Sequence, residues 1–213
     1  MTADVSVGMP IRRSPLDATT EGPHVLASAP GVELLELPFL AHLNLRMSPT
    51  NEAFDAVEAA IGVRPSVTPN RRTAGPAGRG IAWLAPDEWL LVAPGDAGIL
   101  AADLEAAARP HGGAVVDLSA HRTTLEIHGP RSRDVLAAGC SIDLHPRVFE
   151  IAHCAQTTLA RNDVVIGRIE DDAYRIYVRA SFAPYLVAWL QDAIGPGAAG
   201  THTGDAPGRA DDR

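Results

Sequence analysis

The sequence contains no lysine, so all 18 of its Lys and Arg positions are arginine. This absence excludes chemistry that depends on a lysine amine, namely Schiff-base formation and the lysine of a phosphate-binding loop. The 213 residues carry a formal net charge of -8. A nucleic-acid-binding face needs concentrated positive charge, so this balance argues against a nucleic-acid partner.

Long apolar runs are also lacking, and no run reaches the length needed to cross a bilayer. The first residues, Met1 to Pro10, lack the basic segment and apolar core that mark a secretory signal. Only two cysteines are present, Cys140 and Cys154, and without a signal we expect both to be reduced. We therefore expect a cytoplasmic protein with no membrane partner.

The two ends of the chain have compositions typical of flexible tails. Residues 1–30 are rich in Pro, Ser, Thr and Ala without a period, and residues 195–213 are rich in Gly, Ala and Asp. Residues 31–194 form the expected single domain, which is long enough to bury its own core. Within it we expect two related lobes, residues 31–118 and residues 119–194.

Hydrophobic periodicity predicts the elements of this domain. Short apolar or alternating segments predict strands at 32–37, 42–47, 81–84, 88–92, 114–118, 123–128, 154–159, 164–170 and 174–178. Apolar residues at helical spacing predict four helices, three of which are capped by Ser48, Asp96 and Ser181, and one of which begins after Gly129. Ile99 is expected on the buried face of the helix that follows Asp96.

Two patterns recur along the chain. The strand and helix start at 42–49 match those at 123–130, and the strand–acidic turn–strand unit at 83–97 matches the one at 169–183. Both offsets are roughly 80 to 85 residues, as a tandem duplication requires. Two half-sheets, each covered on one face by helices, predict an α+β fold.

Seven segments carry a family likeness: Arg13–Leu16, Trp83–Leu91, Val116–Leu125, Gly129–Leu136, Gly139–Pro146, Cys154–Thr157 and Tyr174–Ala183. In order, and across residues 11–194, they resemble the gamma subunit of heterotetrameric sarcosine oxidase. The resemblance implies a duplicated fold of two related, intertwined lobes, similar to the folate-binding domain of aminomethyltransferases.

The resemblance also implies partners and cofactors. The alpha subunit of such an oxidase carries NAD and tetrahydrofolate, the beta subunit carries the flavins FAD and FMN, and the delta subunit holds zinc. The complex demethylates sarcosine to glycine, passes the methylene group to tetrahydrofolate and produces hydrogen peroxide. The gamma subunit would be a structural assembly subunit without a cofactor, inactive by itself.

We find no dinucleotide or phosphate-loop signature. Cys154 and Gln156 lie in a segment that faintly resembles a folate-binding Lys-Gly-Cys-x-x-Gly-Gln motif, but the lysine and glycines are missing. The chain therefore has no predicted catalytic or metal-binding residue, and we expect the related cleft to be degenerate and without ligand.

Interface candidates come from residue types favoured at the centres of interfaces, Arg and Trp. Three arginines, Arg71, Arg72 and Arg79, lie in a predicted loop at 65–80, where they can pair with carboxylates of a partner. Trp83 and Trp89 flank the turn that follows. We expect these five residues to line a subunit interface.

Two other functions stay open from the sequence. A stand-alone folate-dependent aminomethyltransferase predicts that the purified chain binds tetrahydrofolate. An accessory folate-fold protein for another amine oxidase, or for iron–sulphur maturation, predicts different co-purifying partners.

Overall fold

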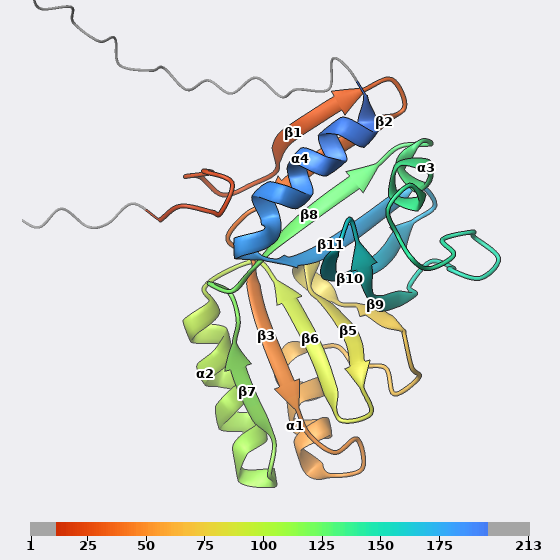
Figure 1. The fold of residues 1–213 in the computed structure, drawn as a ribbon. Helices are drawn as coiled ribbons and strands as arrows, with labels where there is room; N and C mark the ends of the chain where they lie inside the picture. Colours follow the sequence, from red (N-terminus) through yellow and green to blue (C-terminus); the bar gives the residue numbers. More distant parts are fainter. Residues whose placement is uncertain (1–11, 196–213) are drawn as a thin grey trace, which may run out of the picture.

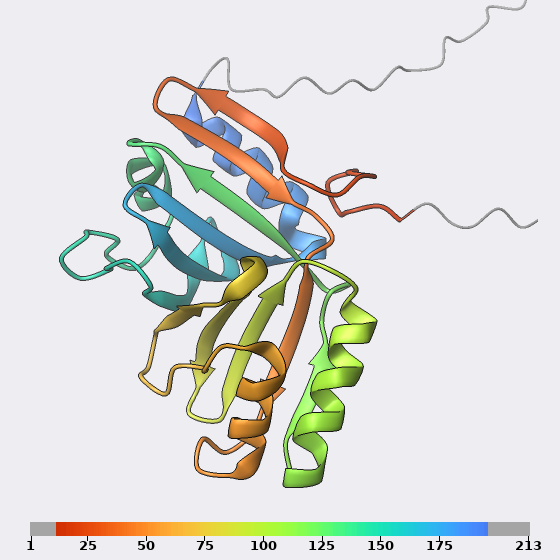
Figure 2. The same ribbon diagram turned by 180° about the vertical axis from the view of Figure 1, so that it is seen from behind.

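The computed structural model describes residues 12–195 and contains two antiparallel sheets, each covered on one face by helices (Figures 1 and 2). The strands are β1 (His24–Ala29), β2 (Val32–Leu37), β3 (Ala41–Arg46), β4 (Arg72–Ala74), β5 (Gly80–Ala85), β6 (Glu88–Ala93), β7 (Ala114–Asp117), β8 (Arg122–His128), β9 (Cys154–Leu159), β10 (Asn162–Glu170) and β11 (Ala173–Arg179). The α-helices are α1 (Glu52–Ile61), α2 (Ala97–Ala108), α3 (Ser132–Ala137) and α4 (Ala183–Ile194). The presence of both helices and antiparallel sheets confirms the predicted α+β class.

The duplication appears in the strand order of the two sheets. The six-stranded sheet runs β1-β2-β8-β11-β10-β9, and the five-stranded sheet runs β4-β5-β6-β3-β7. Without β1, the first sheet matches the second strand for strand, β2 corresponding to β7 and β8 to β3. The two repeats are therefore β2 to α2 and β7 to α4, and each donates its first strand to the other repeat's sheet.

Within residues 31–194, the two sheets divide the chain near the predicted lobe boundary at residues 118 and 119, with the exception of β2. Strand β2 pairs with β8, with Leu34 opposite Ile127, while β7 pairs with β3, with Val115 opposite Leu45. All strands of the five-stranded sheet lie between Ala41 and Asp117, inside the predicted lobe 31–118. The lobes are intertwined, as predicted, because β2 lies in the same range of the chain but joins the six-stranded sheet.

Three groups of buried side chains hold the layers together. One packs α3 and α4 against the six-stranded sheet, and a second packs α1 and α2 against the five-stranded sheet. A third joins the two sheets directly and includes Leu90 and Val92 from β6, Val165 from β10 and Tyr177 from β11. Because of this third group, both faces of the central strands are covered.

The N-terminal prediction of a tail over residues 1–30 is wrong for residues 12–30. Strand β1 pairs with β2, and Ser14 is only 8% exposed. The Ser14 hydroxyl donates to the buried carboxylate of Glu36 over 2.8 Å and accepts from the amides of Leu16 and Ala18. Residues 1–11 and 196–213 lie outside the described part of the chain.

The helix starts agree with the prediction at α2 and differ from it at α1 and α4. Asp96 caps α2 as predicted, and its carboxylate accepts from the amide of Ile99. Asn51 rather than Ser48 precedes α1, and Ser181 lies in a short 3-10 turn before α4. Ile99 is 66% exposed, because α2 turns Leu104 and Ala108 to the core instead. Among residues 12–195, no helix is long and apolar enough to span a bilayer.

Candidate functional site

His42 lies on β3, at the place where the two sheets pack against each other, and is 1% exposed. Its Nε2 lies 2.9 Å from Oγ1 of Thr124 on β8, and its Nδ1 lies 3.0 Å from the carbonyl oxygen of Leu40. The imidazole also meets the ring of Tyr177 edge to face, with centroids 6.0 Å apart. His42 therefore links the first repeat to the central strands of the other sheet.

These contacts fix the tautomer of the histidine. A carbonyl only accepts, so Nδ1 carries the proton and donates to Leu40, which leaves Nε2 to accept from the Thr124 hydroxyl. Burial lowers the pKa of His42 to about 4, although the hydrogen bond to Leu40 acts in the opposite direction. His42 is neutral at physiological pH, and its role is structural: it joins β3 to β8 through the hydrogen bond with Thr124.

A second buried polar contact lies nearby on β2. Glu36 is fully buried and accepts from the hydroxyls of Ser14 and Thr123, each over 2.8 Å. Burial raises the pKa of Glu36, and the two hydroxyl donors oppose that shift. This carboxylate ties the N-terminal segment to β8. Sequence reasoning missed both residues. His42 occupies a position where an alternating strand is expected to face solvent, whereas Glu36 shares the core-facing side of β2 with Val32 and Leu34, where a carboxylate is not expected.

The two cleft candidates lie on β9. Cys154 is fully buried, its thiol lies 3.7 Å from the carbonyl oxygen of Trp83, and burial raises its pKa to about 11. The side-chain amide of Gln156 donates to the carbonyl oxygen of Leu84 over 2.8 Å. Both side chains thus join β9 to β5. The absence of a ligand in this region stays a prediction.

The three arginines do not share one mobile loop, because the predicted loop at 65–80 contains β4 and a 3-10 turn at Pro76–Gly78. Arg71 pairs with Glu150 over 3.1 Å, and Arg79 donates to the carbonyl oxygen of Ile61 at the end of α1 over 2.7 Å. Arg72 packs its guanidinium over Gly80. Their interface role stays a prediction, but Arg71 and Arg79 already have partners within the chain.

The two tryptophans lie opposite each other on β5 and β6. Trp89 is fully buried, packs against Phe54 and donates its indole N–H to the carbonyl oxygen of Ser66 over 2.8 Å. The prediction that Trp89 lines an interface is therefore wrong, because α1 covers it. Trp83 packs against the same helical core and is half-buried, and its interface role stays a prediction.

The turn that follows β7 is held by side-chain hydrogen bonds. The Asp117 carboxylate accepts from both the amide and the hydroxyl of Ser119, which makes a turn. That turn also supports β3, because the Ser119 hydroxyl accepts from the amide of His42 over 3.0 Å. Over residues 12–195, no three His, Cys, Asp or Glu side chains cluster closely enough to hold a metal ion.

Two intertwined repeats with exchanged strands place the chain in the structural class of the aminomethyltransferase fold. The structure resembles glycine cleavage system aminomethyltransferase T from Bartonella henselae with a TM-score of 0.60, at 17% identity, over 75% of this chain and 45% of that chain. At this identity the likeness shows the fold alone.

The particular family follows from closer relatives. Residues 46–196 match the sarcosine oxidase gamma subunit family, and the chain belongs to it. It is 36% identical over 184 residues to sarcosine oxidase subunit gamma of Corynebacterium sp. strain P-1, covering 86% of this chain and 90% of the relative. The subunit from Corynebacterium sp. strain U-96 is 37% identical over 187 residues, with the same coverage.

A solved structure agrees with this assignment. The chain matches one in heterotetrameric sarcosine oxidase from Corynebacterium sp. U-96, in complex with pyrrole 2-carboxylate, with a TM-score of 0.77 at 36% identity. The match covers 87% of this chain and 95% of that chain. The resemblance predicted from the sequence is thereby confirmed.

Proposed function

We propose that this chain is the gamma-type assembly subunit of a heterotetrameric sarcosine oxidase. The observation that supports this proposal best is the similarity to a chain of heterotetrameric sarcosine oxidase, which covers 95% of that chain. Within the complex it supplies packing surface to alpha, beta and delta subunits, and the complex demethylates sarcosine to glycine with formation of hydrogen peroxide.

The polar groups of this chain support a structural role. The side chains of His42, Glu36 and Gln156 are engaged within the fold, each joining segments that are distant in the sequence. We propose that FAD, FMN, NAD, tetrahydrofolate and zinc belong to the other subunits, and that this chain holds none of them. The two free cysteines, one of them buried, suit a reducing compartment such as the cytoplasm.

Reconstitution tests this proposal. The alpha, beta and delta chains are expressed with and without this chain, and peroxide formation from sarcosine is followed together with the size of the assembly. We expect the full-sized, active complex only when this chain is present. An intact assembly of the alpha, beta and delta chains with equal activity in its absence would refute the assembly role.

The alternative of a stand-alone aminomethyltransferase makes a separate prediction. It requires the purified chain to bind tetrahydrofolate, which titration calorimetry measures directly. The shared fold is the observation that favours this alternative, but a fold by itself does not carry an activity.

A further inference from the structure

Strands β8 and β11 present a ladder of side chains toward the five-stranded sheet. Its three rungs are Glu126 opposite Arg175, Thr124 opposite Tyr177, and Arg122 opposite Arg179. The first rung is an ion pair, with Arg175 Nε 2.8 Å from the Glu126 carboxylate. In the second rung, both Thr124 and Tyr177 contact His42, which lies between the two sheets. The third rung sets two arginines against each other.

The third rung places two like charges opposite each other, with Arg122 half-buried and Arg179 exposed. Residues opposite each other on an antiparallel ladder have Cβ atoms roughly 5 Å apart, and like charges there are destabilising. Within residues 12–195, neither guanidinium makes a hydrogen bond or ion pair, and Arg122 Nε is buried without a partner. Burial and the charge of Arg179 lower the pKa of Arg122.

In the part of the chain that the structure describes, neither Arg122 nor Arg179 forms an ion pair with a carboxylate. Glu88 is the acidic residue whose charge acts on Arg122. Its carboxylate already accepts from Asn44 over 2.7 Å and from Arg46 over 2.6 Å. Two adjacent guanidiniums with free donors match the geometry of an incoming carboxylate, which accepts parallel N–H donors.

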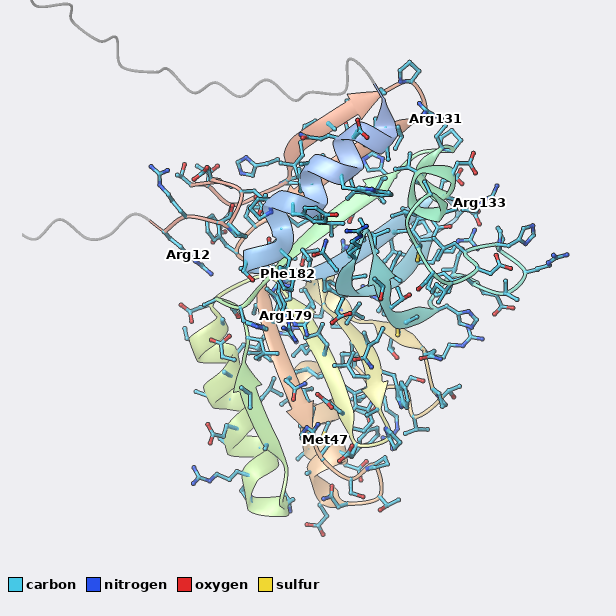
Figure 3. The ribbon with its side chains drawn as sticks, viewed as in Figure 1. Arg12, Met47, Arg131, Arg133, Arg179 and Phe182 are labelled. Atoms are coloured by element: carbon cyan, nitrogen blue, oxygen red, sulfur yellow. The ribbon has the colours of Figure 1, made fainter. Side chains whose placement is uncertain are left out.

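Two exposed aromatic side chains follow Arg179 closely in the chain. Figure 3 shows Arg179 and Phe182 next to each other, at the point where β11 leads into α4. Phe182 is 40% exposed, and Tyr185, one helical turn further on, is 51% exposed. Arg and aromatic side chains are enriched among the residues that dominate binding energy at interfaces.

We propose that Arg122, Arg179, Phe182 and Tyr185 form a docking corner for an acidic segment of a partner subunit, whose carboxylate binds the two guanidiniums. The chain as a whole carries a formal charge of -8, so a local basic corner determines where an acidic segment can approach. This inference deepens the proposed function, since it takes the partner from the oxidase.

The test measures two quantities for each variant: the affinity of the chain for the other subunits, and the melting temperature of the chain alone. We expect R122Q and R179Q each to weaken the affinity by roughly 30-fold or more, the effect of removing one partner of a buried charge pair. R109Q on the exposed end of α2, where Arg109 only pairs with Glu105, is the matched control and keeps the wild-type affinity.

A charge reversal separates docking from folding. R179E would face Arg122 as Glu126 faces Arg175, so we expect it to raise the melting temperature of the chain alone while abolishing docking. If Arg122 and Arg179 had a purely structural role, R179E would change the melting temperature and the affinity for the other subunits in the same direction. The same chain shortened to end at Gly195 should reproduce every result, since the proposed ligand is not its own C-terminal segment.

Three outcomes would overturn the inference. If wild-type chain binds its partners and R122Q and R179Q bind equally well, the corner is not a docking site, although the proposed function stands. If the effects disappear in the shortened chain, the carboxylate belongs to the chain's own C-terminal segment. If the wild-type chain binds no partner, the proposed function fails and the inference fails with it.

Discussion

His42 offers the sharpest stability test, because it is buried between the sheets as the neutral imidazole. Its pKa in the folded state is about 4, below the ordinary value of about 6.5 that it regains on unfolding. At pH values between about 4 and 6.5, His42 is protonated in the unfolded chain but neutral in the folded chain. The free energy of unfolding therefore decreases as the pH falls from about 6.5 to 4. This shift alone removes about 2 kcal/mol between pH 7 and pH 5, and about 3 kcal/mol by pH 4.

The assay is urea unfolding of wild-type and H42Q chains at pH 7, 5 and 4. Glu36 contributes in the opposite sense, since its raised pKa adds stability at low pH that is lost as the pH rises, but it is common to both chains and cancels in their difference. We expect the pH-dependent loss in wild type to exceed that in H42Q by about 3 kcal/mol at pH 4. H121Q, which removes an exposed histidine, is the control. Parallel pH dependences of wild type and H42Q would refute the buried neutral imidazole.

Three further predictions concern single sites. S14A leaves the buried Glu36 carboxylate short of one donor, so we expect a loss of about 1–3 kcal/mol and faster tryptic cleavage after Arg13, measured by mass spectrometry; an unchanged cleavage rate would contradict the anchor. Cys154, with its pKa near 11, should resist a thiol reagent at pH 8 until the chain unfolds, whereas the half-buried Cys140 reacts first; titration of two thiols in the folded chain would be the contrary result. G129A places a Cβ 2.5 Å from a backbone oxygen at a φ of +107°, so a drop of several degrees in the melting temperature is expected, and an unchanged value would contradict the tight turn.

The regular elements were predictable because their signals are local. Alternation marks β3 and β8, and Asp96 marks the start of α2, so the predicted and observed ranges agree closely. The exchange of first strands was not predictable in this way. The apolar pattern of β2 is the same whether it pairs with β3 or with β8, since periodicity specifies a face and not a partner.

The candidate site shows the same limit. His42 occupies a polar position of an alternating strand, which predicts exposure when only one face of a sheet is covered. It is buried because the second face packs against the other sheet. Trp89 was assigned to an interface from its residue type, but α1 covers it, and a tryptophan that packs in a core has the same sequence signal as one at an interface.

The N-terminal segment was misread for a compositional reason. Residues 12–30 are poor in periodic apolar residues, yet β1 needs only one neighbour at the edge of the sheet. Ser14 is held by a contact with Glu36, which lies 22 residues further along the chain. Contacts at that separation leave no pattern within a local window.

The central claim is that this chain acts as a subunit of a larger oxidase, and purification of the tagged chain from its native host tests it most directly. The account predicts a yellow complex that contains two larger chains and one smaller chain, and that forms peroxide from sarcosine. It also predicts that the chain expressed alone has neither flavin absorbance nor this activity. Recovery of the chain as a lone monomer, or sarcosine oxidation by the chain alone, would contradict it.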